Sequence, residues 1–150
     1  MDETQSLQEI QLVAFSLADE EYGVDIHYVQ EIVRLLTITR VPKAPGYVEG
    51  VVNLRGNVVP VIDLRKLFSL PMRDVTDRTR IIIVKIKDIT VGIIVDGVSE
   101  VLTVPVNDIE PPPMANNNID QEFISGVGKL GQRLLMLINL DKVILNLTQQ

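Results

Sequence analysis

The sequence predicts an all-β protein with a few short helices, built from two copies of one small β unit. Three observations support this prediction. Short runs rich in Val, Ile and Leu are separated by polar turns with Gly, Pro, Asn and Asp along most of the 150 residues, a pattern typical of hairpins. Hydrophobic residues make up 46% of the chain, which is enough for a buried core and excludes disorder. The second half of the chain also repeats the pattern of the first.

The first expected element is a hairpin near the N-terminus. Apolar residues over 11–17 indicate a mostly buried strand, and a polar turn then leads to a return strand over 22–26. Asp25 is a good N-cap residue, so we expect a short helix after it, with Glu31 exposed. One face of this helix would carry Val29, Ile32 and Val33.

The central part of the chain predicts two further hairpins with short β-branched strands. These strands cover residues 47–54, 58–62, 80–87 and 89–95. A tight turn at 55–57 joins the first pair, and a turn at Lys87 and Asp88 joins the second. Asp63 directly precedes residues 64–68, which form a short amphipathic helix that Asp63 could cap, and a polar loop follows over 69–79.

The internal repeat is found with two different shifts. The first shift places Val29 on Val98 and superimposes the apolar pattern of 29–33 on that of 98–102. The second shift places Tyr47 on Phe123 and superimposes 47–68 on 123–144, with six identities. Because the second shift is the longer one, the second copy must contain an inserted loop, and we expect it in the Pro- and Asn-rich segment 111–118.

The repeat predicts a single domain over residues 10–147 with two subdomains, roughly 10–75 and 76–147, and leaves open an exchange of strands between them. Residues 1–9 and 148–150 are expected to be tails. Each subdomain would contain about five short strands, whose spacing favours a barrel or sandwich. Because so small a unit buries little surface alone, we expect the two subdomains to pack on each other.

Charge and composition exclude several classes of partner. The net charge is −6 and aromatic residues make up only 4% of the chain, which disfavours a nucleic-acid-binding barrel because such proteins need positive charge and stacking side chains. There is no cysteine, so disulfides and thiolate metal sites are excluded. The N-terminus is polar and acidic, unlike a signal peptide, and the apolar runs are too short to insert into a membrane.

No arrangement of residues predicts catalysis, a metal or a cofactor. His27 is the single histidine, and no Gly-x-Ser-x-Gly turn accompanies it. Asp63 and Asp96 are better explained as helix-cap or turn residues than as a catalytic pair. The sequence 126–128 (GVG) lacks the rest of a phosphate-binding loop. We therefore expect a protein that binds partners and is not an enzyme.

Two features suggest where a partner would bind. The hairpin tip around Arg55 differs from its counterpart in the second copy, and this difference fits either a tolerant turn or an arginine that contacts a partner. The short helix with Val29 and its counterpart with Val98, Val101 and Leu102 would be either core or, at the junction of the subdomains, an apolar groove for a partner helix.

Several motifs in order resemble the CheW-like chemotaxis coupling family, and the resemblance covers roughly residues 10–147. The matching segments are 22–26 (YGVDI), 29–32 (VQEI), 38–42 (ITRVP), 50–56 (GVVNLRG), 60–65 (PVIDLR), 95–101 (VDGVSEV) and 124–129 (ISGVGK). The resemblance implies two SH3-like five-stranded β-barrels packed side by side. It also implies a cytoplasmic adaptor that joins the regulatory domain of a CheA-type histidine kinase to the cytoplasmic tip of chemoreceptors in membrane arrays.

The same resemblance implies particular site residues. The positions linked to receptor contact are Val29, Glu31, Val33, Arg55 and Val101. The positions linked to kinase contact are Gly50, Asn53 and Gly56.

Overall fold

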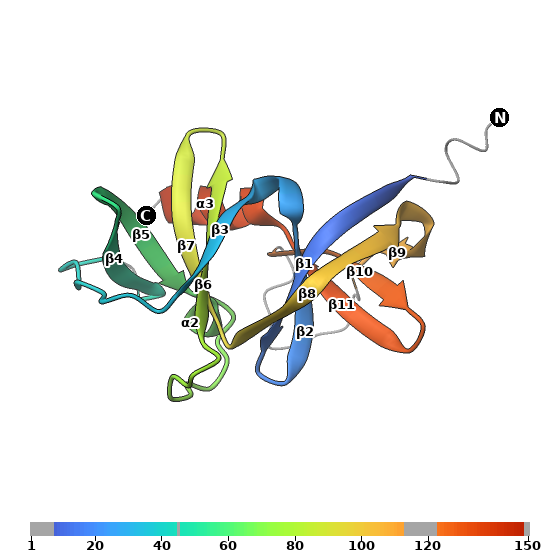
Figure 1. Cartoon of the computed structure of the whole chain (residues 1–150), viewed down its shortest axis with the longest axis horizontal. Helices are drawn as coiled ribbons and strands as arrows, with labels where there is room; N and C mark the ends of the chain where they lie inside the picture. The colour runs from blue at the N-terminus through green and yellow to red at the C-terminus, as the bar shows by residue number, and fades with distance from the viewer. Residues whose placement is uncertain (1–7, 45, 113–122, 149–150) are drawn as a thin grey trace.

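The computed structural model describes residues 8–44, 46–112 and 123–148, without the side chains of 146–148. In these residues eleven strands form two sheets that lie side by side (Figure 1). The strands are β1 (Glu9–Leu17), β2 (Glu20–Asp25), β3 (Val29–Arg34), β4 (Val48–Leu54), β5 (Asn57–Asp63), β6 (Arg80–Ile86), β7 (Ile89–Val95), β8 (Gly97–Pro105), β9 (Ile109–Glu110), β10 (Ile124–Leu130) and β11 (Arg133–Ile138). The helices are the 3₁₀ turns η1 (Ile26–Tyr28) and η2 (Val106–Asp108), and α2 (Leu64–Leu67) and α3 (Leu140–Thr148).

The predicted all-β class with short helices is confirmed, but the expected helix around Val29 is wrong. Asp25 does act as a cap, because its Oδ1 accepts a hydrogen bond from the backbone N–H of His27 at 2.9 Å, yet the helical turn ends at Tyr28. The chain then continues as β3, which pairs with β6. The counterpart segment with Val98 and Val101 is likewise a strand, β8. Half of β3 consists of the β-branched residues Val and Ile, and such residues prefer a sheet when a neighbouring strand is available.

The internal repeat holds element by element. The second shift places β4 on β10 from end to end and the start of α2 on the start of α3, and the first shift places the start of β2 on the start of β7. Asp63 and its counterpart Asn139 both cap the helix that follows, since their side-chain oxygens accept backbone N–H groups of Arg65 at 2.9 Å and Lys142 at 3.2 Å. Most of the expected insertion, residues 113–118, lies outside the described residues.

The two sheets have equivalent strand orders but do not correspond to the two halves of the chain. The six-stranded sheet has the order β8-β1-β2-β11-β10-β9, and the five-stranded sheet has the order β3-β6-β7-β5-β4. Each sheet therefore takes one hairpin from the opposite half, so a division of the chain near residue 75 does not separate the sheets. The sixth strand is the two-residue β9, whose counterpart in the other sheet is the isolated bridge between Thr39 and Val51.

A shared apolar core holds the sheets together. It contains buried side chains from both sheets and from α2 and α3, while each sheet also has a smaller core of its own. A row of aromatic rings crosses the shared core, with centroid separations of 5.8 to 6.0 Å. The row consists of Phe15, Tyr22, Phe68 and Phe123. None of the described helices is long and apolar enough to cross a bilayer.

Candidate functional site

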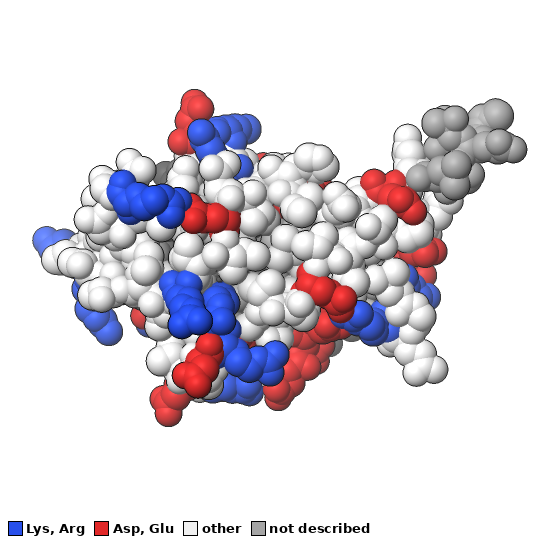
Figure 2. Space-filling view, in the orientation of Figure 1, with Lys and Arg blue, Asp and Glu red and all other residues white. Residues whose placement is uncertain are grey.

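The edge strands β3 and β8 form an apolar surface at the junction of the sheets, which we call the edge-strand face. Val29 and Val98 occupy equivalent positions in these strands, and both pack against the shared core. Ile32 and Val101 are also equivalent, and they are 40% and 51% exposed. Figure 1 shows both strands on the near side, and Figure 2 shows that mainly uncharged side chains cover the middle of this side.

Because β3 is a strand, its side chains alternate between two surfaces. Val33 packs against the separate core of the five-stranded sheet, whereas Ile32 lies opposite Ile82, a residue of the shared core. Val33 therefore lies on the other side of β3 from the edge-strand face. Ile32 and Val29 lie on the same side of β3 because of an irregularity in the ladder between Val29 and Glu31. Strict alternation would have placed Ile32 on the opposite side from Val29.

Glu31 and Arg55 are brought together by the fold. Glu31 lies on β3, Arg55 lies in the turn between β4 and β5, and the guanidinium donates a hydrogen bond to the Glu31 carboxylate. The Glu31 and Arg55 side chains are 30% and 67% exposed. An ion pair this exposed adds little stability, but it holds the Arg55 guanidinium beside the first residues of β3.

Asn53 and Gly56 form the same turn and lie at the tip of the β4–β5 hairpin. The Asn53 side-chain oxygen accepts the backbone N–H of Gly56 at 2.8 Å, and Gly56 has a φ of +88° with open space around its Cα. Beside them Val58 is 70% exposed. The counterpart of Val58 in the β10–β11 hairpin, Leu134, is 57% exposed. Figure 1 shows these two hairpins at opposite ends of the molecule.

Gly50 is not a surface contact, because it is buried in β4 beside the Thr39 bridge. Its φ is +151°, and a Cβ at this position would lie 2.1 Å from the Thr39 carbonyl oxygen. The backbone of Thr39 and Val51 is joined there by two hydrogen bonds of 2.8 Å. Glycine is therefore required at position 50 for the close approach of two backbone segments.

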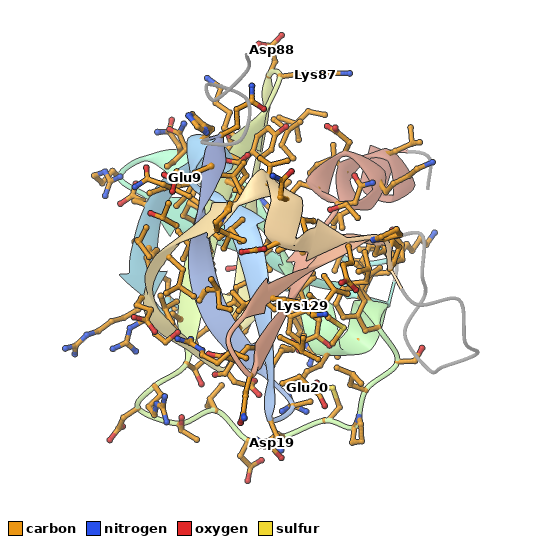
Figure 3. The ribbon with its side chains drawn as sticks, turned by 90° about the vertical axis from the view of Figure 1, so that its right-hand side faces the viewer. Glu9, Asp19, Glu20, Lys87, Asp88 and Lys129 are labelled. Atoms are coloured by element: carbon orange, nitrogen blue, oxygen red, sulfur yellow. The ribbon has the colours of Figure 1, made fainter. Side chains whose placement is uncertain are left out.

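The junction of the sheets also contains a partly buried ion pair that the sequence did not predict. The guanidinium of Arg65, which is 4% exposed, donates to Asp96 from Nε at 3.1 Å and from Nη2 at 2.5 Å. Asp96 also accepts the backbone N–H of Ala18 at 2.9 Å. Arg73 lies 3.5 Å from Asp19 at the β1–β2 turn, which Figure 3 shows beside the 69–79 loop. These contacts connect the loop, α2 and both sheets.

The environments of these acids shift their pKa values in opposite directions. Burial alone would raise the pKa of Asp96, but the hydrogen bonds from Arg65 and Ala18 outweigh it and lower the pKa. Burial raises the pKa of Asp63, although the backbone N–H of Arg65 partly opposes the shift. Within the residues that the structure describes, no group of three His, Cys, Asp or Glu side chains could hold a metal ion.

Comparison with known families gives a match over nearly the whole chain. The family model described as "CheW-like domain" matches residues 11–147. Among curated proteins, the chain is 40% identical over 133 residues to a chemotaxis protein CheW of Bacillus subtilis, covering 89% of this chain and 85% of that protein. It is 39% identical over 134 residues to a chemotaxis protein CheW of Klebsiella aerogenes, covering 89% and 81% of the two chains.

A solved structure has the same fold. The crystal structure of the scaffolding protein TtCheW from Thermoanaerobacter tengcongensis matches with a TM-score of 0.82 and 42% sequence identity. The match covers 88% of this chain and 90% of that chain.

Proposed function

The chain belongs to the CheW-like domain family, and from this premise we propose that it is an adaptor that couples chemoreceptors to a CheA-type histidine kinase. The coarser role, a scaffold in chemotaxis, is supported by relatives that are named as chemotaxis proteins and by the scaffolding protein with the same fold. The finer role requires two separate binding surfaces, one for each partner. The protein would act by binding both and would catalyse no reaction.

The observation that carries the proposal is the edge-strand face. Val29, Ile32, Val98 and Val101 leave apolar area exposed where two edge strands flank the junction of the sheets. Exposed, contiguous apolar area of this kind is typical of a protein-binding surface. The cytoplasmic tip of a chemoreceptor is a helical hairpin, and helices dock on such surfaces through apolar residues spaced three and four apart. Glu31 lies opposite Ile83, on the same side of β3 as Val33, so Arg55, held by Glu31, would contact a polar group of the receptor beyond the apolar edge-strand face.

The kinase would bind at the end of the five-stranded sheet. Asn53, Gly56 and Val58 lie in the β4–β5 hairpin, where Val58 is largely exposed. The regulatory domain of the kinase has a related fold, and one of its own hairpins would contact the β4–β5 hairpin. Gly50 would act there indirectly, by keeping β4 in the shape that presents the hairpin.

With both partners bound, a change in the receptor can reach the kinase through the adaptor. If the edge-strand face binds two receptor states with different affinity, linkage requires that the receptor state shifts the equilibrium of the bound kinase. The adaptor would then work at the membrane without entering it, through its receptor partner.

The experiment that tests the receptor surface uses Val101→Asp with Leu134→Asp as a matched control. Both residues are apolar, more than half exposed and in strands, so both substitutions add the same charge at a small cost in stability. Co-sedimentation with receptor-containing nanodiscs should be lost for Val101→Asp and kept for Leu134→Asp. Equal receptor binding by the two folded variants would exclude the edge-strand face as the receptor surface.

A nucleic-acid-binding barrel is the main rival function. The net charge of −6 predicts no binding to single-stranded DNA in a gel-shift assay at moderate salt. A salt-sensitive shift at micromolar protein would support the rival function.

A further inference from the structure

The internal repeat makes the edge-strand face nearly symmetric, which raises the question of how a partner helix takes one direction across it. β3 and β8 are equivalent strands, and each pairs with an equivalent neighbour, β6 or β1. Val29 and Ile32 on one strand have the counterparts Val98 and Val101 on the other. These apolar contacts alone would therefore hold a helix almost equally well in either of two opposite directions.

The charges at the two ends of the face break this symmetry. At the end of β3, Arg34 lies directly opposite Arg80 in the ladder with β6. At the equivalent place in the other sheet, Thr103 of β8 lies directly opposite Gln11 of β1. Like charges on directly opposed residues destabilise a sheet, so the arginine pair is not explained by the stability of the ladder.

A third arginine extends the basic end toward β8. Arg78 is exposed, and its Nε and Nη2 lie 3.6 Å from where a Cβ on Gly97, the first residue of β8, would stand. The residue equivalent to Arg78 in the repeat is Glu9, which is exposed at the start of β1. We call Arg34, Arg78 and Arg80 the arginine end of the face.

The arginine end is short of negative partners. In the described part of the chain, none of its three guanidinium groups forms an ion pair with a carboxylate. Arg80 instead donates to the carbonyl oxygens of Asp77 and Thr79, each at 2.8 Å. These bonds fix the Arg80 side chain, while Arg34 is free to turn toward a partner. Asp77 is the one acid that lines the same hollow of about 410 Å³ as Arg34 and Arg80. Arg78 lines a second hollow with Asp74 and with Asp19 and Asp96, and the last two acids are already paired with Arg73 and Arg65.

Figure 2 shows Lys and Arg side chains below the lower ends of β3 and β6, with acidic side chains beside them. The difference between the two ends of the face therefore lies in which charges are paired, and not in an absence of acids at the arginine end. Figure 3 places Glu9 at the other end of β1 from the turn that carries Asp19 and Glu20. In a protein with a net charge of −6, a local group of three unpaired arginines produces a positive field that attracts carboxylates.

We infer that Arg34, Arg78 and Arg80 bind acidic side chains of the partner helix and thereby fix the direction in which that helix crosses the edge-strand face. This inference rests on the proposed function, because it takes the receptor helix as the occupant of the face. The recognised chemistry is a helix whose apolar stripe is bordered at one end by Glu or Asp. Arginine suits this role because its planar group binds a carboxylate through two hydrogen bonds.

The test replaces two arginines by the residues that the repeat itself carries at the same places, in the double variant Arg34→Thr, Arg80→Gln. The matched control is the double variant Arg40→Thr, Lys85→Gln, which also removes two positive charges from exposed residues outside the face. Affinity for receptor-containing nanodiscs, measured by titration at two salt concentrations, should fall roughly tenfold at low salt for the double variant. The affinity of the double variant should depend less on salt concentration than that of the unsubstituted protein. The control should have the affinity and the salt dependence of the unsubstituted protein.

Direction is measured separately with a spin label. The chain has no cysteine, so Thr103→Cys, at the end of the face away from the three arginines, gives a single labelling site. A second label on the receptor helix near its tip should give one distance with the arginines present and two distances in the double variant.

The outcomes distinguish the inference from the proposed function. No receptor binding by the unsubstituted protein, in the presence of normal kinase binding, removes the proposed receptor surface and the inference with it. Normal receptor binding together with an unchanged affinity and a single distance in the double variant overturns the inference alone. An equal loss of affinity in the control Arg40→Thr, Lys85→Gln overturns it too, because the effect would then be one of total charge.

Discussion

Replacing Gly50 by alanine tests the role of this residue as a backbone requirement of the five-stranded sheet. The added Cβ would lie 2.1 Å from the Thr39 carbonyl oxygen and 2.8 Å from its carbon. Because both are backbone atoms, no side-chain rotation can relieve the clash. The segment at Thr39 must move away from β4, or the φ of +151° at residue 50 must change.

The expected loss of stability follows from the hydrogen bonds that break and from the backbone strain of an alanine at position 50. Moving the segment breaks the two Thr39–Val51 hydrogen bonds, each of which contributes about 1 kcal/mol. An alanine held at a positive φ of this kind costs about 1–3 kcal/mol. We therefore expect Gly50→Ala to lower the free energy of unfolding by about 3–5 kcal/mol.

Urea unfolding followed by circular dichroism measures this loss, with two controls that separate its parts. Gly46→Ala has nothing within 4 Å of its added Cβ and should change stability by less than about 0.5 kcal/mol. Gly56→Ala also meets no atoms but has a φ of +88°, so it should cost about 1 kcal/mol from backbone strain alone. If Gly50→Ala is no less stable than Gly56→Ala, the clash with Thr39 contributes nothing to stability, and the claim that position 50 requires glycine for this close approach is refuted.

Three further predictions concern the core and the ion pair. Tyr22→Phe should raise the free energy of unfolding by about 1 kcal/mol in urea titrations, because the buried hydroxyl has no hydrogen-bond partner among the described residues and its removal leaves the stacked ring in place. A loss of stability would show that the hydroxyl is satisfied. Arg65→Met should cost about 2–4 kcal/mol at pH 7, because it leaves the Asp96 carboxylate without its guanidinium; a cost below about 1 kcal/mol would contradict this. The lowered pKa of Asp96 means that the pair stabilises the fold above the ordinary Asp pKa and ceases to do so as the pH falls through the folded value. The difference in unfolding free energy between the unsubstituted protein and Arg65→Met should therefore shrink from pH 7 to pH 3, and a constant difference would refute this explanation.

Much of the fold could be predicted from the sequence because local patterns determine it. The β4–β5 hairpin, its turn at Arg55 and the helix capped by Asp63 all follow from alternation, turn residues and capping within about 20 residues. The segment after Asp25 was assigned to a helix because Val29, Ile32 and Val33 also have helical spacing. The segment instead forms a strand because it pairs with β6, and this pairing joins residues 29–34 to the distant segment 80–84.

The candidate site also depends on pairings between distant segments, which the sequence does not reveal. The apolar pattern predicts Val29, Ile32, Val98 and Val101 as core or partner-groove residues, and the structure shows that they lie on two equivalent edge strands instead of two helices. The pairing of Arg65 with Asp96 could not be predicted, since it depends on which hairpin enters which sheet. The equivalence of the exposed residues Val58 and Leu134 could have been predicted from the sequence, because the shift that places β4 on β10 also aligns these two residues.

The central claim is that one molecule of this protein joins a receptor to a kinase. The most direct measurement is sedimentation of receptor-containing nanodiscs with the full-length CheA-type kinase of the same organism, at increasing concentrations of the unsubstituted protein. The account predicts that the kinase sediments with the receptor only when the adaptor is present, and that the amount saturates when adaptor and kinase are bound one to one. Kinase that sediments equally without the adaptor, or an adaptor that leaves the receptor when the kinase binds, would contradict the account.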